Sequence, residues 1–321
     1  MSSDTTTHTS TDTSPVSQIA KWLSFLGTKQ SPTRGSLIGN LARIFVIACA
    51  LFFALFPVVW IISASFNPTG SMSTQTLIPK NAESVSDVLV NFRRLFDDPQ
   101  IPFWRWIGNS IFVSSVTTIL ILIVTSLSAY AFSRFRFTGR RNVLLLIFLV
   151  QVFPSLLAMV AIYLMLVQIG KYIPPLGINT YGGLIMVYIG GGMATNIWLL
   201  KGYFDTIPRD IDESAQVDGA THIQTFWYLI FPLVRPILAV VGLLGFVGPF
   251  NDFLLARIIL TDRDNWTLMV GMFSFVEGGE FSTDWGVFAA GSLIAAIPIV
   301  VLYLALQRFI VGGLTVGAVK G

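Results

Sequence analysis

Residues 107–132 have the sequence IGNSIFVSSVTTILILIVTSLSAYAF, and SRFRFTGRR follows at 133–141. The first stretch contains no Asp, Glu, Lys or Arg, and it exceeds the roughly 20 apolar residues that a helix needs to cross a bilayer core about 30 Å thick. The second stretch concentrates four arginines. Lys and Arg gather in cytoplasmic loops. The pair therefore predicts a transmembrane helix that ends at the inner face of a membrane.

The composition of the whole chain agrees with this prediction. Of its 321 residues, 54% are hydrophobic and only 12% charged, with a mean hydropathy of +0.72. Soluble domains average about 25% charged residues, so most of this surface must face lipid. A net charge of +3 is too small to indicate a nucleic-acid partner. One cysteine excludes an internal disulfide, and two histidines leave little for metal binding or acid–base catalysis. We expect an integral membrane protein that is not an enzyme and binds no metal.

The gaps between charged residues predict an all-α protein with six transmembrane helices. Five charge-free runs are long enough alone, and the fifth span needs Arg235 to extend its side chain toward the interface. Prolines at 57, 154, 249 and 298 predict kinks. The predicted spans are 42–65, 107–132, 143–168, 182–204, 233–258 and 286–308.

The distribution of basic residues predicts the orientation. With the N-terminus inside, thirteen Lys and Arg residues lie on the cytoplasmic side and seven outside, which favours both termini in the cytoplasm. Residues 1–38, rich in Ser and Thr, are expected to form a disordered cytoplasmic tail. Residues 39–321 would form the membrane domain.

The predicted spans contain almost no ionisable residues, which bears on the energy source. Carriers driven by protons or ions usually need charged groups inside the membrane, and Asp252 lies close to the end of its span. The driving energy is therefore expected from another subunit. Polar side chains within or near the spans are candidates for a translocation path, although such groups more often bond neighbouring helices: Gln151, Tyr188, Asn196, Asn251 and Asp252.

The segment 205–232, DTIPRDIDESAQVDGATHIQTFWYLIFP, which we call the elbow, separates the fourth and fifth spans on the cytoplasmic side. Pro208 and the acidic residues after it favour a short helix, and Asp218-Gly219 predicts its end. Thr221 and Gln224 form a capping-box pattern for a second helix. Ile223, Trp227 and Ile230 would share one apolar face of that helix. The pattern fits either a dock for a soluble partner or a helix pair resting on lipid.

The elbow resembles the E-A-A-x3-G-x9-I-x-L-P signature of the permease subunits of ATP-binding cassette (ABC) importers. Glu213, Ala215, Gly219 and Pro232 stand at the signature spacing. Ser214, Leu229 and Phe231 are conservative departures from it. In such permeases the elbow is the coupling helix, which sits in a cleft of the cytoplasmic ATPase.

The resemblance extends over roughly residues 40–321 and points to the MalG-type maltose/maltodextrin permeases of the carbohydrate-uptake family. It is carried by further stretches of the sequence: YAFSR at 130–134, NTYGG at 179–183, KGYF at 201–204, FNDF at 250–253, and QRFIVGGLT at 307–315. It implies a MetI-like helix bundle in the bacterial cytoplasmic (inner) membrane. It also implies an ATPase dimer, a second, MalF-like permease and an extracytoplasmic sugar-binding protein as partners, besides membrane lipid. No G-x-x-x-x-G-K-[ST] loop is present, so this chain cannot hydrolyse ATP by that route. The resemblance implies that the chain itself binds no cofactor and that ATP and Mg belong to the ATPase.

The same resemblance assigns roles within the chain. It implies that loop 261–284 reaches toward the sugar-binding protein and that tail 309–321 runs between the ATPase subunits. The residues expected to couple the chain to the ATPase all lie in the elbow: Glu213, Ser214, Ala215, Asp218, Gly219, Ala220, His222 and Phe226.

Three alternatives remain open: a permease for another solute class, a self-sufficient carrier, and a membrane-embedded enzyme.

Overall fold

A computed structural model describes residues 37–68, 76–77, 84–276 and 285–318, and within these ranges it contains helices and no strand. Residues 1–36 of the predicted tail lie outside the described residues. The longer helices are α2 (Leu37–Ser65), α5 (Phe103–Arg134), α6 (Arg140–Val152), α7 (Ser155–Tyr172), α8 (Tyr181–Asp205), α12 (Arg235–Asn251) and α15 (Trp285–Ala318). The shorter ones are α3 (Val85–Val88), α4 (Val90–Asp97), α9 (Asp210–Val217), α10 (His222–Gln224), α11 (Phe231–Leu233), α13 (Leu254–Ile259) and α14 (Leu268–Phe273). Two 3₁₀ turns, η2 (Pro174–Leu176) and η4 (Arg263–Asn265), and one π-helix, η3 (Thr225–Ile230), complete the set.

The chain divides into two compact units at Pro57, within α2. In the first unit, every described side chain from Gly39 to Pro57 is exposed. Phe45 is 70% exposed and Phe53 84% exposed. A helix that is apolar on all sides requires a non-aqueous surrounding, so this part of α2 is suited to lipid or to another membrane protein.

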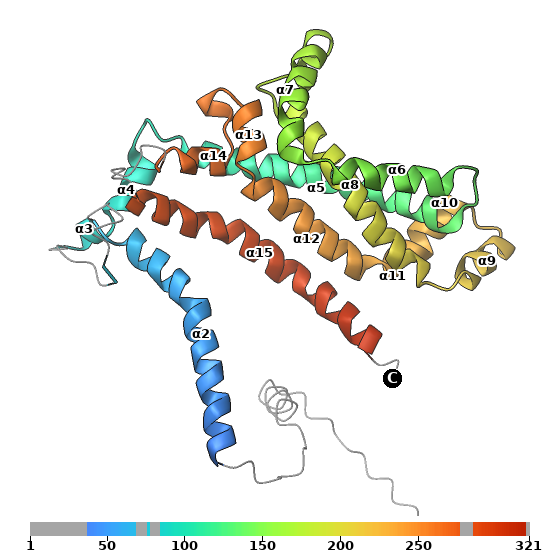
Figure 1. Cartoon of the computed structure of the whole chain (residues 1–321), viewed down its shortest axis with the longest axis horizontal. Coiled ribbons are helices and arrows are strands. Elements are labelled where there is room, and N and C mark those ends of the chain that lie inside the picture. Colours follow the sequence, from blue (N-terminus) through green and yellow to red (C-terminus); the bar gives the residue numbers. More distant parts are fainter. Residues whose placement is uncertain (1–36, 69–75, 78–83, 277–284, 319–321) are drawn as a thin grey trace, which may run out of the picture. The chain divides into compact units, whose positions relative to one another are not determined.

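The second unit is a helix bundle in which α5 packs along α8 and α12, and α12 packs along α15 (Figure 1). Three clusters of buried apolar side chains follow the length of α5. One lies around Phe103 and Trp106, where α5 begins, and another around Val113. The third surrounds Ala129 and Tyr130 near its end and includes residues of the elbow. The third cluster fixes the position of the elbow.

Four described helices are long and apolar enough to cross a membrane, and the number rises to six if each of two bent helix pairs forms one span. The upper number matches the six predicted spans. Pro57 and Pro298 lie inside α2 and α15, which continue through them. Helix α15 also runs past its predicted end at 308 to Ala318.

The third predicted span, 143–168, is not one helix. It consists of α6 and α7, which meet at an angle of 106° (Figure 1). Phe153 is extended, with φ −69° and ψ 129°. A residue before proline avoids the α conformation, and proline itself lacks the N–H that a helix interior needs. Pro154 therefore breaks the span where a milder kink was predicted.

The fifth predicted span, 233–258, is also corrected. Helix α12 covers only Arg235–Asn251, and the extended Asp252 separates it from α13. The carboxylate of Asp252 accepts hydrogen bonds from the Tyr188 hydroxyl at 2.8 Å and the Ala256 N–H at 3.0 Å. These bonds stabilise the break. Before α12, the helical backbone of η3 continues through Pro232 in α11 and breaks at Val234. The chain turns there by 81° into α12.

Candidate functional site

The elbow forms as two short helical pieces separated by a glycine. Asp210, Asp212 and Glu213 occupy the first turn of α9, where carboxylates interact favourably with the positive end of the helix dipole. Helix α9 ends at Val217 with Asp218 as its C-cap, and Gly219 follows with φ +83°. This left-handed conformation is strained for residues with a side chain. The predicted break at Asp218-Gly219 is therefore confirmed.

The second piece begins with the predicted capping box. The Thr221 hydroxyl accepts a hydrogen bond from the Gln224 N–H, and the Gln224 side chain accepts one from the Thr221 N–H. After α10, however, the chain adopts the π-helix η3. Its buried residues are Thr225, Phe226 and Ile230.

The predicted apolar face made by Ile223, Trp227 and Ile230 is wrong. Ile223 is 72% exposed and Trp227 44% exposed, whereas Ile230 is fully buried. A π-helix makes i→i+5 bonds, so the α-helical spacing that placed these side chains on one face does not apply. Phe226 takes the inward position and lies 5.1 Å, ring centre to ring centre, from Tyr130 of α5.

A buried ion pair joins α9 to the end of α5. The Arg134 Nε atom lies 2.9 Å from the Asp212 carboxylate, and the two side chains are only 6% and 8% exposed. The Tyr130 hydroxyl donates to the same carboxylate at 3.0 Å, and Arg134 donates to the carbonyl oxygen of Ile207 at 3.1 Å. A buried ion pair is tolerated when further hydrogen bonds satisfy its atoms. Each partner makes one such bond through another atom, whereas the paired Nε and Oδ2 atoms have, within the described residues, no contact of hydrogen-bond geometry and rely on their mutual ion pair.

A second set of polar contacts joins the elbow to α8 and to α5. The Ser133 hydroxyl donates to Asp205 at 2.6 Å, and Lys201 pairs with the same carboxylate. Arg209 donates to the Ser133 carbonyl oxygen at 3.3 Å. These contacts join the end of α8 and the residue before α9 to the same end of α5.

The exposed side of the elbow carries most of the residues predicted to meet the ATPase. Glu213, Ser214, Asp218, Gly219 and His222 are exposed, and Ala220 is half-buried. His222 also contacts the Phe135 ring, with 5.0 Å between ring centres.

Two predicted coupling residues lie on the other side of the elbow. Ala215 and Phe226 are buried, at 5% and 2% exposure. Their side chains hold the elbow onto the bundle and do not form its outer surface.

The residues predicted to line a path do not converge on one site. Tyr188 and Asp252 are hydrogen-bonded across α8 and the end of α12. Gln151 donates to Thr195, and Asn196 donates back to the carbonyl oxygen of Gly192 within α8. Asn251 is exposed. The structure thus brings together only the Tyr188–Asp252 pair.

At the opposite end of the bundle, Asn179 organises the loop that follows α13. Its side-chain oxygen accepts hydrogen bonds from the Thr261 N–H at 3.1 Å and the Asp262 N–H at 3.0 Å. Its φ of +59° is left-handed, a conformation that Asn tolerates better than most residues. Arg105 forms an ion pair with Asp264 in the same loop, and the Trp106 indole N–H donates to the backbone carbonyl oxygen of Arg263. Residues 277–284 of the predicted contact loop lie outside the described residues.

The comparisons with known proteins decide the family. The family described as "Binding-protein-dependent transport system inner membrane component" matches residues 121–315, a range that contains the elbow. The chain belongs to this family.

Curated relatives are similar in sequence to this permease over most of its length. The maltose/maltodextrin transport system permease protein MalG of Vibrio vulnificus is 40% identical over 273 residues, covering 83% of this chain and 91% of that protein. The galactooligosaccharides transport system permease protein GanQ of Bacillus subtilis is 38% identical over 271 residues, covering 83% and 90%. A solved bacterial ABC transporter that imports alginate superposes with a TM-score of 0.71 at 23% identity, covering 86% of this chain and 98% of that one. The last comparison establishes the fold.

Membership of the family settles two points about this permease. It is an inner-membrane component of a transport system, and it is a permease and not an enzyme. Within the described ranges, no three His, Cys, Asp or Glu side chains are grouped so that they could hold a metal ion.

The sequence alone did not single out Arg134 and Tyr130 as residues that hold the elbow against α5. Both residues fall in the YAFSR run, and Arg134 served there only as a sign of orientation. An arginine at the end of an apolar span, together with a surplus of acidic residues in the elbow, was the available signal.

Proposed function

We propose that this permease is a transmembrane subunit of an ABC importer that takes up maltose, maltodextrins or closely related oligosaccharides. One observation carries the substrate class: relatives that share 37–40% identity over most of the chain are named for maltose, maltodextrin or galactooligosaccharide transport. The GanQ relative keeps the class open to other small oligosaccharides.

The partners follow from the same family. A separate ATPase dimer binds ATP and Mg and meets the exposed side of the elbow through Glu213, Ser214, Asp218, Gly219 and His222. A second, MalF-like permease completes the path. An extracytoplasmic sugar-binding protein delivers the sugar to the end of the bundle where Asn179 holds the outer loop. The binding-protein dependence in the family description supports the last partner.

The elbow transmits the ATPase movement to the path. Its buried ion pair and the Phe226–Tyr130 contact join it to α5, and the 81° turn at Val234 joins it to α12. Closure of the ATPase dimer pulls the elbow and turns these helices against their neighbours. This movement switches the bundle between two arrangements, one open to each side of the membrane.

Sugar uptake tests the proposed substrate class. Cells of the native host that lack this chain should fail to accumulate radiolabelled maltose or maltotriose, and the wild-type gene should restore uptake. Unlabelled galactooligosaccharide, an amino-acid mixture and inorganic phosphate serve as competitors. Uptake that is unaffected by loss of this chain, or that only a non-sugar competitor suppresses, would refute the sugar assignment.

Co-purification tests the elbow separately. Affinity purification of the tagged wild-type chain in mild detergent should recover an ATPase carrying a phosphate-binding loop and a second permease. Glu213→Lys reverses an exposed charge and should deplete the ATPase while retaining the permease. Recovery of equal ATPase with both forms would remove Glu213 from the contact.

A further inference from the structure

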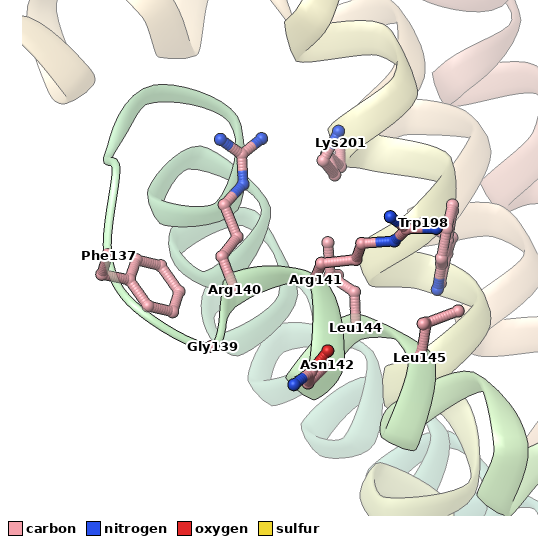
Figure 2. A pocket seen from close by; sticks show the side chains of 9 residues that line it. All are labelled: Phe137, Gly139, Arg140, Arg141, Asn142, Leu144, Leu145, Trp198 and Lys201. Atoms are coloured by element: carbon pink, nitrogen blue, oxygen red, sulfur yellow. The ribbon is translucent and has the colours of Figure 1, made fainter.

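A pocket of about 620 Å³ lies between the start of α6 and the last turns of α8, outside both the elbow and the outer loop (Figure 2). Its nine lining residues include three cations, Arg140, Arg141 and Lys201, and no acidic side chain. Asn142 adds amide donors. The charge of this lining therefore favours an anion.

In the described part of the chain the two arginines of the pocket form no close ion pair, although Arg140 lies within electrostatic range of the Asp205 carboxylate. Among the residues that the structure describes, Lys201 pairs with Asp205, whereas Arg140 and Arg141 take part in no ion pair within 4.0 Å. Arg140 donates at 3.4 Å to the carbonyl oxygen of Phe135. In Figure 2, Arg140 and Arg141 extend from the start of α6, with Arg141 directed toward Trp198. Cations at this end of a helix repel the positive end of its dipole, and an anion bound in the pocket would relieve that repulsion.

The remainder of the pocket is apolar and leads out along α6. Leu144, Leu145 and Trp198 line its wall. Beyond them, Leu149 and Val152 lie on the same side of α6 as Leu145, and these three side chains are 51–66% exposed. A basic site thus continues directly into an exposed apolar strip.

We propose that this pocket binds the phosphate headgroup of an anionic phospholipid, whose acyl chains lie along α6. The combination of cations, an aromatic side chain and an adjoining apolar strip matches an amphiphile and exceeds what a free phosphate would use. The basic loop that begins the pocket is predicted to face the cytoplasm, and basic pockets between transmembrane helices on that side suit anionic lipid. The lipid braces α6 against α8, whose last turn holds Asp205 and its contact to Ser133 beneath the elbow.

Native mass spectrometry of the detergent-purified permease with its partner subunits tests the proposal. After lipid removal, the complex is titrated with phosphatidylglycerol and, separately, with phosphatidylcholine of the same acyl chains. The wild type should retain phosphatidylglycerol preferentially. Arg141→Gln should weaken its binding about fivefold, the effect of one basic residue near an anionic headgroup.

A matched control removes the same charge outside the pocket. Arg136 lies exposed in the same loop and does not line the cavity, so Arg136→Gln should leave binding unchanged, and Arg141→Lys should restore most of it. Asn142→Glu provides a variant that should keep its fold, because a glutamate in the first turn of α6 favours the helix. It should weaken phosphatidylglycerol binding at least as much as Arg141→Gln.

Three results would overturn the proposal. Equal losses in Arg136→Gln and Arg141→Gln would show a general charge effect. Equal retention of phosphatidylcholine would show that the anion is not recognised. Displacement of phosphatidylglycerol by inorganic phosphate at equal concentration would assign the pocket to a small soluble anion.

Discussion

Asp212 is the residue on which the attachment of the elbow depends. Asp212→Asn keeps an oxygen that can accept from Tyr130, but it leaves the Arg134 charge buried without its counter-ion. Removing one partner of a buried pair costs about 3–5 kcal/mol. We expect the free energy of unfolding of the purified complex to fall by that amount, together with a loss of ATP hydrolysis stimulated by sugar and binding protein.

Two variants isolate this effect from the exposed surface. Glu213→Gln removes the neighbouring exposed charge and should change the stability by no more than about 0.5 kcal/mol. Asp212→Asn combined with Arg134→Gln removes both buried charges and should recover part of the lost stability. If Asp212→Asn were as mild as Glu213→Gln in denaturant titrations, the buried pair would have no structural role.

Asn179 offers a second test, at the opposite end of the bundle. Asn179→Ala removes three side-chain hydrogen bonds, two from the Thr261 and Asp262 N–H groups and one to the Asp262 carboxylate, and it places at φ +59° a residue that tolerates this conformation poorly. The expected loss of stability is about 3 kcal/mol, from three bonds of roughly 0.5–1.5 kcal/mol each and the strain. Asn179→Gly relieves the strain and loses only the bonds, so it should fall between Ala and wild type in thermal unfolding. An Ala variant as stable as the wild type would contradict this account.

At the scale of the element, the break between α9 and α10 depends on the backbone conformation of one residue, Gly219. Gly219 has φ +83° and open space where a Cβ would stand, so Gly219→Ala introduces backbone strain of roughly 1–2 kcal/mol without a clash. We expect weaker ATPase co-purification with little loss of chain abundance. Gly219→Asn, which accepts the left-handed region more readily, should be milder.

Gly202 in α8 provides the matched control for this change. It also has open space where a Cβ would stand, but it lies in ordinary helical backbone. Gly202→Ala should raise stability by roughly 0.5–1 kcal/mol, the usual gain within a helix. If both alanine variants behaved alike in stability and co-purification, the break between α9 and α10 would not depend on the backbone conformation of Gly219.

The elements differ in how far their sequence determines them. The break at Gly219 and the capping box at Thr221 were predictable, because each depends on residues a few positions apart. The π-helix at 225–230 was not, because its register is set by the packing of Phe226 against Tyr130, which lies far away in the chain. Proline at 154 predicted a disturbance, but its size depends on what α6 and α7 pack against.

At the scale of the whole molecule, the charge-free stretches predicted the number of spans because a bilayer imposes length and polarity on each helix separately. The same stretches carried no information on which polar residues meet. Tyr188 and Asp252 pair because α8 and α12 are neighbours, and Asn196 bonds within its own helix instead. The partner that each polar residue finds is therefore a property of the assembled bundle.

The orientation of the molecule is testable through its only cysteine. Cys49 lies in α2, and Cys49→Ser gives a background in which single cysteines can be introduced. Thr138 is exposed in the loop between α5 and α6, and Tyr172 is 85% exposed at the end of α7. The excess of basic residues predicts that Thr138→Cys faces the cytoplasm. If α6 and α7 together cross the membrane, Tyr172→Cys faces the opposite side.

Intact cells whose outer layers admit the reagent are treated with a maleimide that cannot cross the inner membrane. It should label Tyr172→Cys and not Thr138→Cys. Inverted inner-membrane vesicles should give the reverse pattern. Labelling of both positions from the same side would mean that α6 and α7 enter and leave by one face, because their 106° bend allows a re-entrant loop as well as a span. The chain would then cross five times, and the elbow after α8 would lie across the membrane from the end of α5. The ion pair between Asp212 and Arg134, at 2.9 Å, holds the elbow beside that end of α5. This contact is the reason that we expect α6 and α7 to cross together, which leaves the elbow on the side where an ATPase can reach it.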